Sequence, residues 1–484
     1  MKNTFYRIFR LKPDESKLVF ALGAILFVNY TAMGITKVVS VSGFLSQVKD
    51  HYILLVWAVD MVLLILATGL QSLIIDRYNR VALLGGVLLV FTGLYALLPF
   101  SFLSATFPKS ISYTLLYLLN DQQWRFFPVV FWILVNDIFS PAQGRRLLPV
   151  IANFAFIGTI IGLGVGALDA RIQIGPVKLL YFNAGIFLIA FIISRTSLKK
   201  VRISTSSRAS VAMKEVFSEG WEFITTIPAY AYLAAGMLST GIIMTILLYD
   251  VLSEAKFDLG NGFQAFYAQY SLMIAFGSLL VQSFANWIIE RVSLKNSFLI
   301  QPLTMLSAAL ANFFIPGYFS SAAAQGAARV SYETIDQSSR KALQAFVPNE
   351  KRGRVSMFID SYLPSFGTII GSMLTFGIIT AGIKYSYDRP NYTAVYMVVA
   401  VLVAILAIIS INMMRKTYDV SMLNWQLKRR TRGASMLDGL DFAEGGAGKA
   451  DPANPEGAAP PEKKRISYRS TLLKDLDLPD KDKE

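Results

Sequence analysis

The stretch Gly158-Thr159-Ile160-Ile161-Gly162 recurs 209 residues later as Gly367-Thr368-Ile369-Ile370-Gly371. A Gly-Arg pair precedes each copy, at 144–145 and at 353–354, with the same offset. The shared spacing predicts that the chain consists of two related halves. Both copies lie inside apolar segments, where repeated small residues favour close packing of helices over phosphate binding.

The composition around these repeats is that of a membrane protein. Of 484 residues, 54% are hydrophobic and 16% are charged, whereas a soluble chain has roughly 25% charged residues. Many of the apolar segments approach or exceed the ~20 residues that cross a bilayer as a helix. The sequence predicts an all-α polytopic protein with twelve transmembrane helices, at about 18–45, 51–75, 81–103, 111–139, 147–169, 177–195, 229–253, 262–288, 296–315, 319–344, 355–383 and 391–415.

A longer polar connection divides these segments into six plus six. Its second part, through Val216, Phe217, Trp221 and Phe223, has the pattern of an amphipathic helix. The predicted organisation is an N-terminus at 1–17, a six-helix bundle at 18–196, a linker at 197–228, a second bundle at 229–415 and a disordered tail at 416–484. The basic cluster Arg429, Arg430 and Arg432 suits contact with anionic membrane lipids; the alternative is a solubilising tail without a specific partner.

Positive charge is distributed unevenly between the two sides of the membrane. The side that carries both termini holds 22 of the loop lysines and arginines, and the opposite side holds 7. Because positive residues mark the cytoplasmic side, both termini are predicted to be cytoplasmic. The net charge of +14 therefore reflects topology, and nucleic acid is not an expected partner.

Metal, cofactor and enzyme signatures are missing from the sequence. It has no cysteine and a single histidine, His51, at a segment edge, where an interfacial residue is the simpler interpretation. We find neither a Walker loop nor a dinucleotide-binding glycine pattern at a strand–helix junction. The chain is therefore expected to bind no metal or cofactor and to have no enzymatic activity.

Ionisable residues inside apolar segments are the main candidate site residues. A charge in hydrocarbon costs at least ~2.5–3.5 kcal/mol, so such residues usually face a watery cavity or a partner. Apart from Asp60 in the second segment, they belong to segments 1, 4, 7 and 10, one in each three-segment unit. The predicted cavity residues are Lys37, Asp121, Arg125, Asp250, Arg329, Glu333 and Asp336. In segment 10, Arg329, Glu333, Asp336 and Arg340 have the spacing of one helical stripe, and mutual neutralisation between packed helices is the alternative.

The first loop adds a family resemblance. Asp76-Arg77-Tyr78-Asn79-Arg80 resembles the Asp-Arg-x-Gly-Arg loop of the major facilitator superfamily, and Glu290-Arg291 begins a degenerate second copy. Two fused six-helix halves are also the design of that superfamily. The resemblance implies a major facilitator fold, in which Asp76, Arg77, Arg80, Glu290 and Arg291 serve gating rather than substrate binding.

Further motifs resemble the ATP/ADP translocase (nucleotide transporter) family. They are Asn29-Tyr30-Thr31 with Thr36-Lys37, Phe131-Trp132 with Asn136-Asp137 and Gln143-Gly144-Arg145-Arg146, Leu248-Tyr249-Asp250-Val251, and Lys341 with Ala345-Phe346-Val347-Pro348. Gly34 and Ile35 replace that family's Arg-Asp. The resemblance implies substrate-binding roles for Lys37, Asp250 and Lys341; Asp121 is the nearest match to the family's fourth-helix glutamate.

Two hypotheses follow for function. The first is a secondary active transporter that moves a small organic anion, with a nucleotide as one candidate, by alternating access. The second is a non-transporting membrane scaffold or assembly factor that retains the fold. A water-accessible cavity lined by the buried charges favours the first, because a scaffold gains nothing from them.

Overall fold

The computed structural model describes residues 13–75, 79–199, 213–344, 347 and 354–444, and these form helices without strands. The chain has two compact units, Met1–Leu423 and Asn424–Glu484. The helical residues of the second unit belong to the end of one helix, α18 (Arg389–Glu444). The site and the repeats all lie in the first unit.

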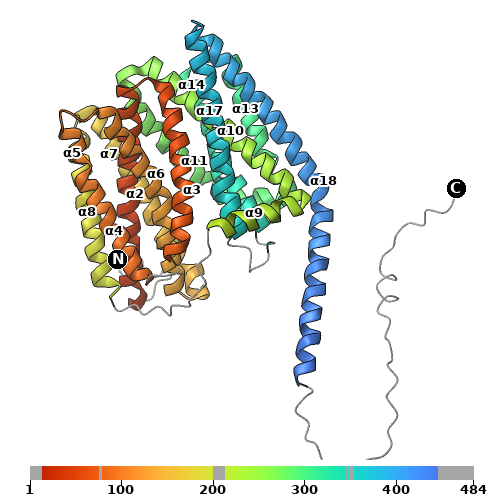
Figure 1. The fold of residues 1–484 in the computed structure, drawn as a ribbon. Helices are drawn as coiled ribbons and strands as arrows, with labels where there is room; N and C mark the ends of the chain where they lie inside the picture. The colour runs from red at the N-terminus through yellow and green to blue at the C-terminus, as the bar shows by residue number, and fades with distance from the viewer. Residues whose placement is uncertain (1–12, 76–78, 200–212, 345–346, 348–353, 445–484) are drawn as a thin grey trace, which may run out of the picture. The chain divides into compact units, whose positions relative to one another are not determined.

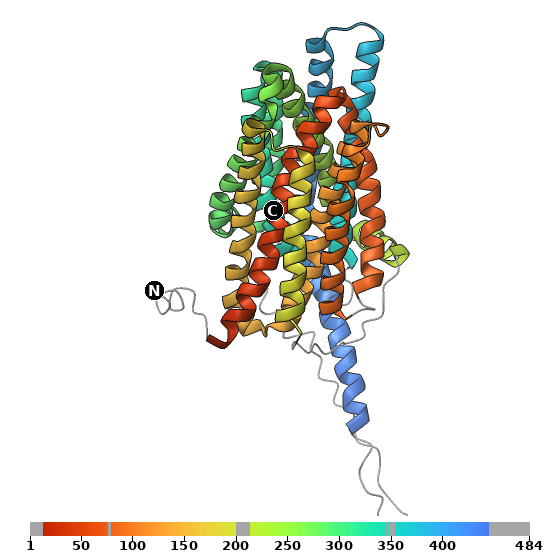
Figure 2. The same cartoon turned by 90° about the vertical axis from the view of Figure 1, so that its left-hand side faces the viewer.

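The first half of unit one is a bundle of long helices (red to yellow in Figure 1). Its elements are α2 (Pro13–Gln47), η1 (Asp50–Tyr52), α3 (Ile53–Ile75), α4 (Arg80–Leu97), α5 (Pro99–Leu103), α6 (Lys109–Ile138), α7 (Pro141–Ile172) and α8 (Pro176–Ser197). Figure 2 shows several of these helices side by side with their axes roughly parallel.

The second half also consists of long helices, with several short elements between them (green to blue in Figure 1). It contains α9 (Met213–Thr226), α10 (Pro228–Leu259), η2 (Gly260–Gly262), α11 (Phe263–Val292), α12 (Leu294–Ser297), α13 (Ile300–Phe314), α14 (Tyr318–Ser331), the π-helical turn η3 (Tyr332–Asp336), α15 (Gln337–Gln344), a second π-helical turn η4 (Phe358–Tyr362), α17 (Leu363–Lys384) and α18.

Local sequence signals set where these helices begin and end. Ser140 and Gln143 form a capping box at the start of α7, where Pro141 occupies a first-turn position. The helix ends at Ile172, and the residue that follows, Gln173, is in the left-handed region with φ 51°. Gly175, with φ 87°, then turns the chain into Pro176, the first residue of α8.

Hydropathy supports an integral, multi-pass membrane protein. Among the described residues, nine helical stretches are long and apolar enough to cross a membrane. One of them, Pro228–Val292, contains both α10 and α11. The predicted segments 4 and 10 correspond to α6 and to α14–η3–α15, which carry the central charges and are not among the nine. Twelve crossings thus remain a prediction, although each predicted segment coincides with a helix.

The two glycine repeats have the same environment in the two halves. A Cβ added to Gly158 would lie 2.6 Å from the Phe27 carbonyl oxygen of α2, and one added to Gly367 would lie 2.5 Å from the Leu238 carbonyl oxygen of α10. Each repeat therefore packs backbone to backbone against the first long helix of its own half. This equivalence supports the interpretation of the repeat as a duplication, with glycines used for packing.

The linker contains the predicted helix, whereas the tail is helical over part of the range that was predicted to be disordered. The amphipathic helix appears as α9, whose Phe217 ring lies 5.4 Å from that of Phe358 in η4. The tail prediction needs correction, because α18 continues to Glu444, 29 residues beyond the expected end at 415. Residues 416–444 contain no proline and only two glycines, so the helix has no strong stop signal there. Residues 445–484 lie outside the described residues.

Candidate functional site

The first-helix motif contributes to two different environments. Asn29 and Thr36 are buried within the first half, where Gln123 donates to Asn29 Oδ1 at 3.0 Å and Asn183 donates to Thr36 at 3.0 Å. Tyr30 and Lys37, also seven residues apart, lie on another face of α2 and line a cavity. Seven residues make almost two helical turns, so each pair occupies one face.

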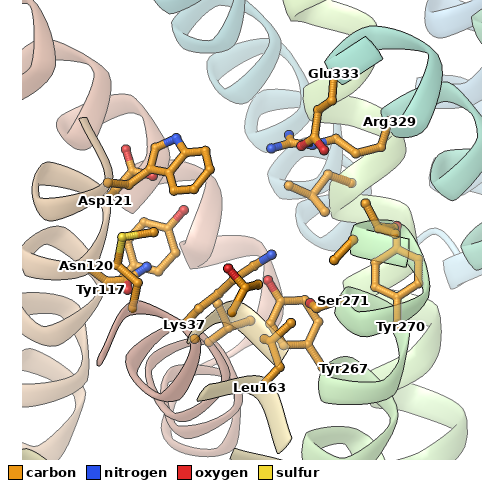
Figure 3. Close-up of a pocket in the computed structure, with 18 of the residues that line it drawn as sticks. Lys37, Tyr117, Asn120, Asp121, Leu163, Tyr267, Tyr270, Ser271, Arg329 and Glu333 are labelled. Atoms are coloured by element: carbon orange, nitrogen blue, oxygen red, sulfur yellow. The ribbon is translucent and has the colours of Figure 1, made fainter. Parts of the chain in front are cut away.

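The cavity lies between the two halves and has a volume of about 410 Å³. Its walls come from α2, α3, α6 and α7 in the first half and from α10, α11, α14, η3 and α17 in the second. This volume is within the ~300–1,000 Å³ range of small-molecule sites. In Figure 3, Tyr117, Asn120 and Asp121 line one side and Tyr267, Tyr270 and Ser271 the other.

Five charged residues line this cavity. Arg125 Nε donates to Asp121 Oδ2 at 2.9 Å within α6, and Arg329 pairs with Glu333 across the start of η3. Ser278 of α11 also donates to Glu333, at 3.1 Å. Lys37 projects between the walls in Figure 3. Its Nζ lies 5.8 Å from the Tyr267 ring centroid, and it forms no ion pair with any residue in the described part of the chain.

Aromatic side chains form much of the remaining wall. They include Tyr30, Trp57, Tyr117, Trp124, Phe156, Tyr267 and Tyr270. The three cations exceed the two carboxylates by one positive charge. Planar rings beside a cation provide both stacking surfaces and an anion-binding charge.

The predicted stripe on segment 10 is interrupted. Arg329 and Glu333 line the cavity, but Asp336 is buried away from it and pairs with Arg340 at 2.9 Å. Arg340 also reaches Asp360 of η4, at 3.2 Å. The cause is η3, because a π-helical turn inserts an extra residue and rotates the following face by about 100°. Placing Asp336 in the cavity was therefore wrong.

Asp250 and Lys341 also lie away from the cavity. Asp250 is 2% exposed and accepts hydrogen bonds from Asn312 at 3.0 Å, Ser321 at 2.6 Å and Tyr396 at 2.8 Å. It is therefore satisfied inside the second half. Lys341 follows η3 on α15, where its side chain is exposed and outside the cavity wall. The structure supports neither residue as a cavity ligand.

The predicted gating residues lie in different environments, and their gating role stays a prediction. Arg80 forms an ion pair with Asp137 at the end of α6, within the first half. Asn79, in the place of the usual glycine, caps α4 by accepting from the Val81 amide at 2.9 Å. Asp76 and Arg77 lie outside the described residues. Glu290 and Arg291 are exposed near the end of α11.

Two hydrogen-bonded contacts between the halves lie near the ends of α2 and α7. Tyr249 donates to Asp50 Oδ2 at 3.2 Å, and Ser253 donates to the same oxygen. At the second point, Gln264 donates to Asp169 Oδ2 at 2.7 Å. We call these two points the far-side contacts, because they lie at the end opposite to the start of α2. The sequence contains these polar residues but gives no sign that they pair.

Asp60 is the buried charged residue that does not fit the pattern of charges in segments 1, 4, 7 and 10. It lies on α3, is fully buried, and accepts a hydrogen bond from Gln122 at 3.0 Å, next to the cavity residue Asp121. Its charge inside an apolar segment was the available signal. It was not included in the predicted site because it breaks the pattern of one charged segment in three.

No model of a protein family matches the sequence, and no curated protein sequence matches it. Solved structures do resemble it. The nucleoside transporter NupG has a TM-score of 0.61 at 14% identity, over 82% of this chain and 98% of that one. A bacterial homologue of the human lysosomal transporter Spinster, inward-facing and unoccupied, has a TM-score of 0.57 at 13% identity, over 85% and 99%.

A bacterial homologue of the iron transporter ferroportin, in an inward-facing state, has a TM-score of 0.57 at 14% identity, over 84% of this chain and 100% of that one. The chain has the major facilitator fold. Identities this low carry the fold and not the substrate, so the resemblance to ATP/ADP translocases remains a prediction.

Proposed function

We propose that this major facilitator fold works as a secondary active transporter for a small organic anion. The observation that supports this most directly is the cavity between the halves, which holds two guanidinium groups and the Lys37 ammonium group, which has no ion pair to any described residue. A substrate anion would bind Lys37 first. It would then compete with Asp121 for Arg125 and with Glu333 for Arg329, drawing the two halves together.

A nucleotide is the finer candidate. The aromatic wall suits a planar base, and guanidinium groups suit phosphate geometry. NupG is a nucleoside transporter with a similar fold. Uptake of labelled ATP, ADP and simple carboxylates into proteoliposomes tests the proposal. Uptake that saturates and is absent from empty liposomes would support it, whereas no uptake of any of them would oppose it.

The orientation that we propose places both termini in the cytoplasm. The absence of cysteine makes a labelling test clean. Ser197→Cys at the end of α8 should be protected from an impermeant thiol reagent in intact cells, while Asn261→Cys in η2 should react. Both positions are exposed. The reverse labelling pattern would overturn the orientation.

The far-side contacts are proposed as the gate that closes one end of the cavity. Asp169→Cys with Gln264→Cys, joined by a short reducible thiol linker, should hold that end closed and stop uptake by at least tenfold. Reduction should restore it, because the linker changes only whether the halves can separate. Each single cysteine variant treated with the same reagent serves as the control. Full uptake by the linked double variant would remove this pair from the gate.

A further inference from the structure

A pair of carboxyl groups lies between α3 and α6, beside the cavity. Asp60 is 0% exposed. Its Oδ1 accepts from Gln122, whereas its Oδ2 is buried without a hydrogen-bond partner in the described structure. The Asp60 and Asp121 carboxyl groups lie within hydrogen-bonding reach of each other.

Two ionised carboxylates can only accept hydrogen bonds, so a bond between them requires a proton on one. Two like charges this close also repel, and ionising Asp60, which is fully buried, adds the cost of burying a charge. Arg125 supplies one positive charge, and its Nε is already bonded to Asp121 at 2.9 Å. One guanidinium therefore serves two acids, and a proton on Asp60 would satisfy its unpartnered oxygen.

The other titratable groups around Asp60 do not replace that proton. Arg125 and Tyr117, both from α6, are also electrostatic neighbours of Asp60. The helix α17 packs on α3, but its single charged residue, Lys384, is at its last position. The elements η1, η4 and α9 also contact α3, and their described titratable groups are Asp50, His51, Tyr52, Asp360, Tyr362, Glu219 and Glu222.

Three of the acidic groups among these have partners of their own. Asp50 accepts from Ser253, Asp360 pairs with Arg340, and Glu219 pairs with Arg354. None of them supplies a cation to Asp60. The charge of the carboxyl pair is thus set by α6 and by whether a proton is present.

We propose that Asp60 and Asp121 form a proton-binding site that couples a proton to the substrate anion; the coupling rests on the proposed transport function. With Asp60 ionised, the three carboxylates Asp60, Asp121 and Glu333 balance the three cations Lys37, Arg125 and Arg329. A proton from water that binds Asp60 forms an O–H group that donates to Asp121. It leaves the site with one positive charge, which a singly charged anion neutralises, so proton and anion cross in the same direction.

The proton site is testable without a substrate. Infrared spectra of the purified full-length protein in liposomes, recorded across a pH series, should contain a carbonyl stretch from a protonated, buried carboxyl group. Asp60→Asn should lose this band. Asparagine keeps the shape of the side chain and can donate to Asp121 through its amide N–H group, which does not titrate and is not a carboxyl group. Asp137→Asn, which removes a carboxylate paired with Arg80, should keep it. Identical bands in the wild type and in Asp60→Asn at every pH would overturn the proposal.

A second variant, Asp121→Asn, tests the same site in case Asp60→Asn does not fold. In Asp121→Asn, Asp60 no longer shares Arg125 with Asp121 and should ionise, so the same band should be lost; a retained band would count against the pair. Coupling is a separate measurement. An inward proton gradient should raise uptake of labelled ADP or a simple carboxylate in the wild type and not in Asp60→Asn. Equal stimulation of both would exclude coupling through Asp60, and absence of uptake would bear on the transport proposal alone.

Discussion

Gly162→Ala is expected to destabilise the chain strongly, although it adds one methyl group. A Cβ at Gly162 would lie 2.3 Å from the Thr31 carbonyl oxygen and 3.0 Å from Gly34 Cα. Both atoms belong to the backbone of α2, which cannot move aside like a flexible side chain. Overpacking in a close-packed core typically costs about 1–3 kcal/mol, and more where the neighbour is rigid. The midpoint temperature of the detergent-solubilised protein, followed by size-exclusion chromatography, measures the loss.

The chain supplies matched controls on the same helices. Gly164→Ala in α7 meets nothing within 4 Å, and Gly377→Ala in α17 is equally open, so both should melt close to the wild type. Gly367→Ala should behave like Gly162→Ala, because its Cβ would lie 2.5 Å from the Leu238 carbonyl oxygen. A Gly162→Ala variant as stable as Gly164→Ala would contradict the packing seen between α2 and α7.

The membrane architecture was largely predictable from the sequence because it depends on segment length and hydrophobicity. The segment expected at 18–45 is α2, Pro13–Gln47, and the one expected at 147–169 lies within α7. The repeat also predicted correctly which helices correspond. These signals are local, so they survive without any knowledge of tertiary contacts.

The composition of the cavity was only partly predictable. Lys37, Asp121, Arg125, Arg329 and Glu333 line it as expected. Asp336 does not, since helical spacing assumes a regular helix and η3 is a π-helical turn that no sequence rule identifies. Asp250 was misjudged for another reason. Its buried partners Asn312, Ser321 and Tyr396 come from three other helices, and a single sequence does not show that they meet.

Asp60 shows the limit of an argument from periodicity. A charge in an apolar segment is a functional signal wherever it occurs, but the one-in-three pattern gave a reason to discount this one. In the structure, Asp60 on α3 lies beside Asp121 on α6. The far-side contacts were hidden for the same reason, because Asp169 and Gln264 are 95 residues apart.

Loss of the Lys37 charge is expected to have the largest effect on substrate binding. Lys37 lines the cavity without an ion pair in the described structure, so Lys37→Gln removes a charge that is available to a substrate anion. Losing a charged hydrogen bond to the anion costs roughly 1.5–3 kcal/mol, or about ten- to a hundred-fold in affinity. Folding should be preserved, because a cavity charge contributes little to packing. Concentration-dependent uptake into proteoliposomes, at matched amounts of reconstituted protein, measures the change.

Lys341→Gln distinguishes the binding site implied by the family resemblance from the cavity in the structure. The resemblance gives Lys341 a role in substrate binding, whereas the structure places it exposed and outside the cavity. We therefore expect uptake by Lys341→Gln to match the wild type while uptake by Lys37→Gln falls. Equal losses in both variants would favour the site implied by the resemblance over the observed cavity. Near-wild-type uptake by a well-folded Lys37→Gln variant would remove Lys37 from the site, and with it the main charge argument for an anionic substrate.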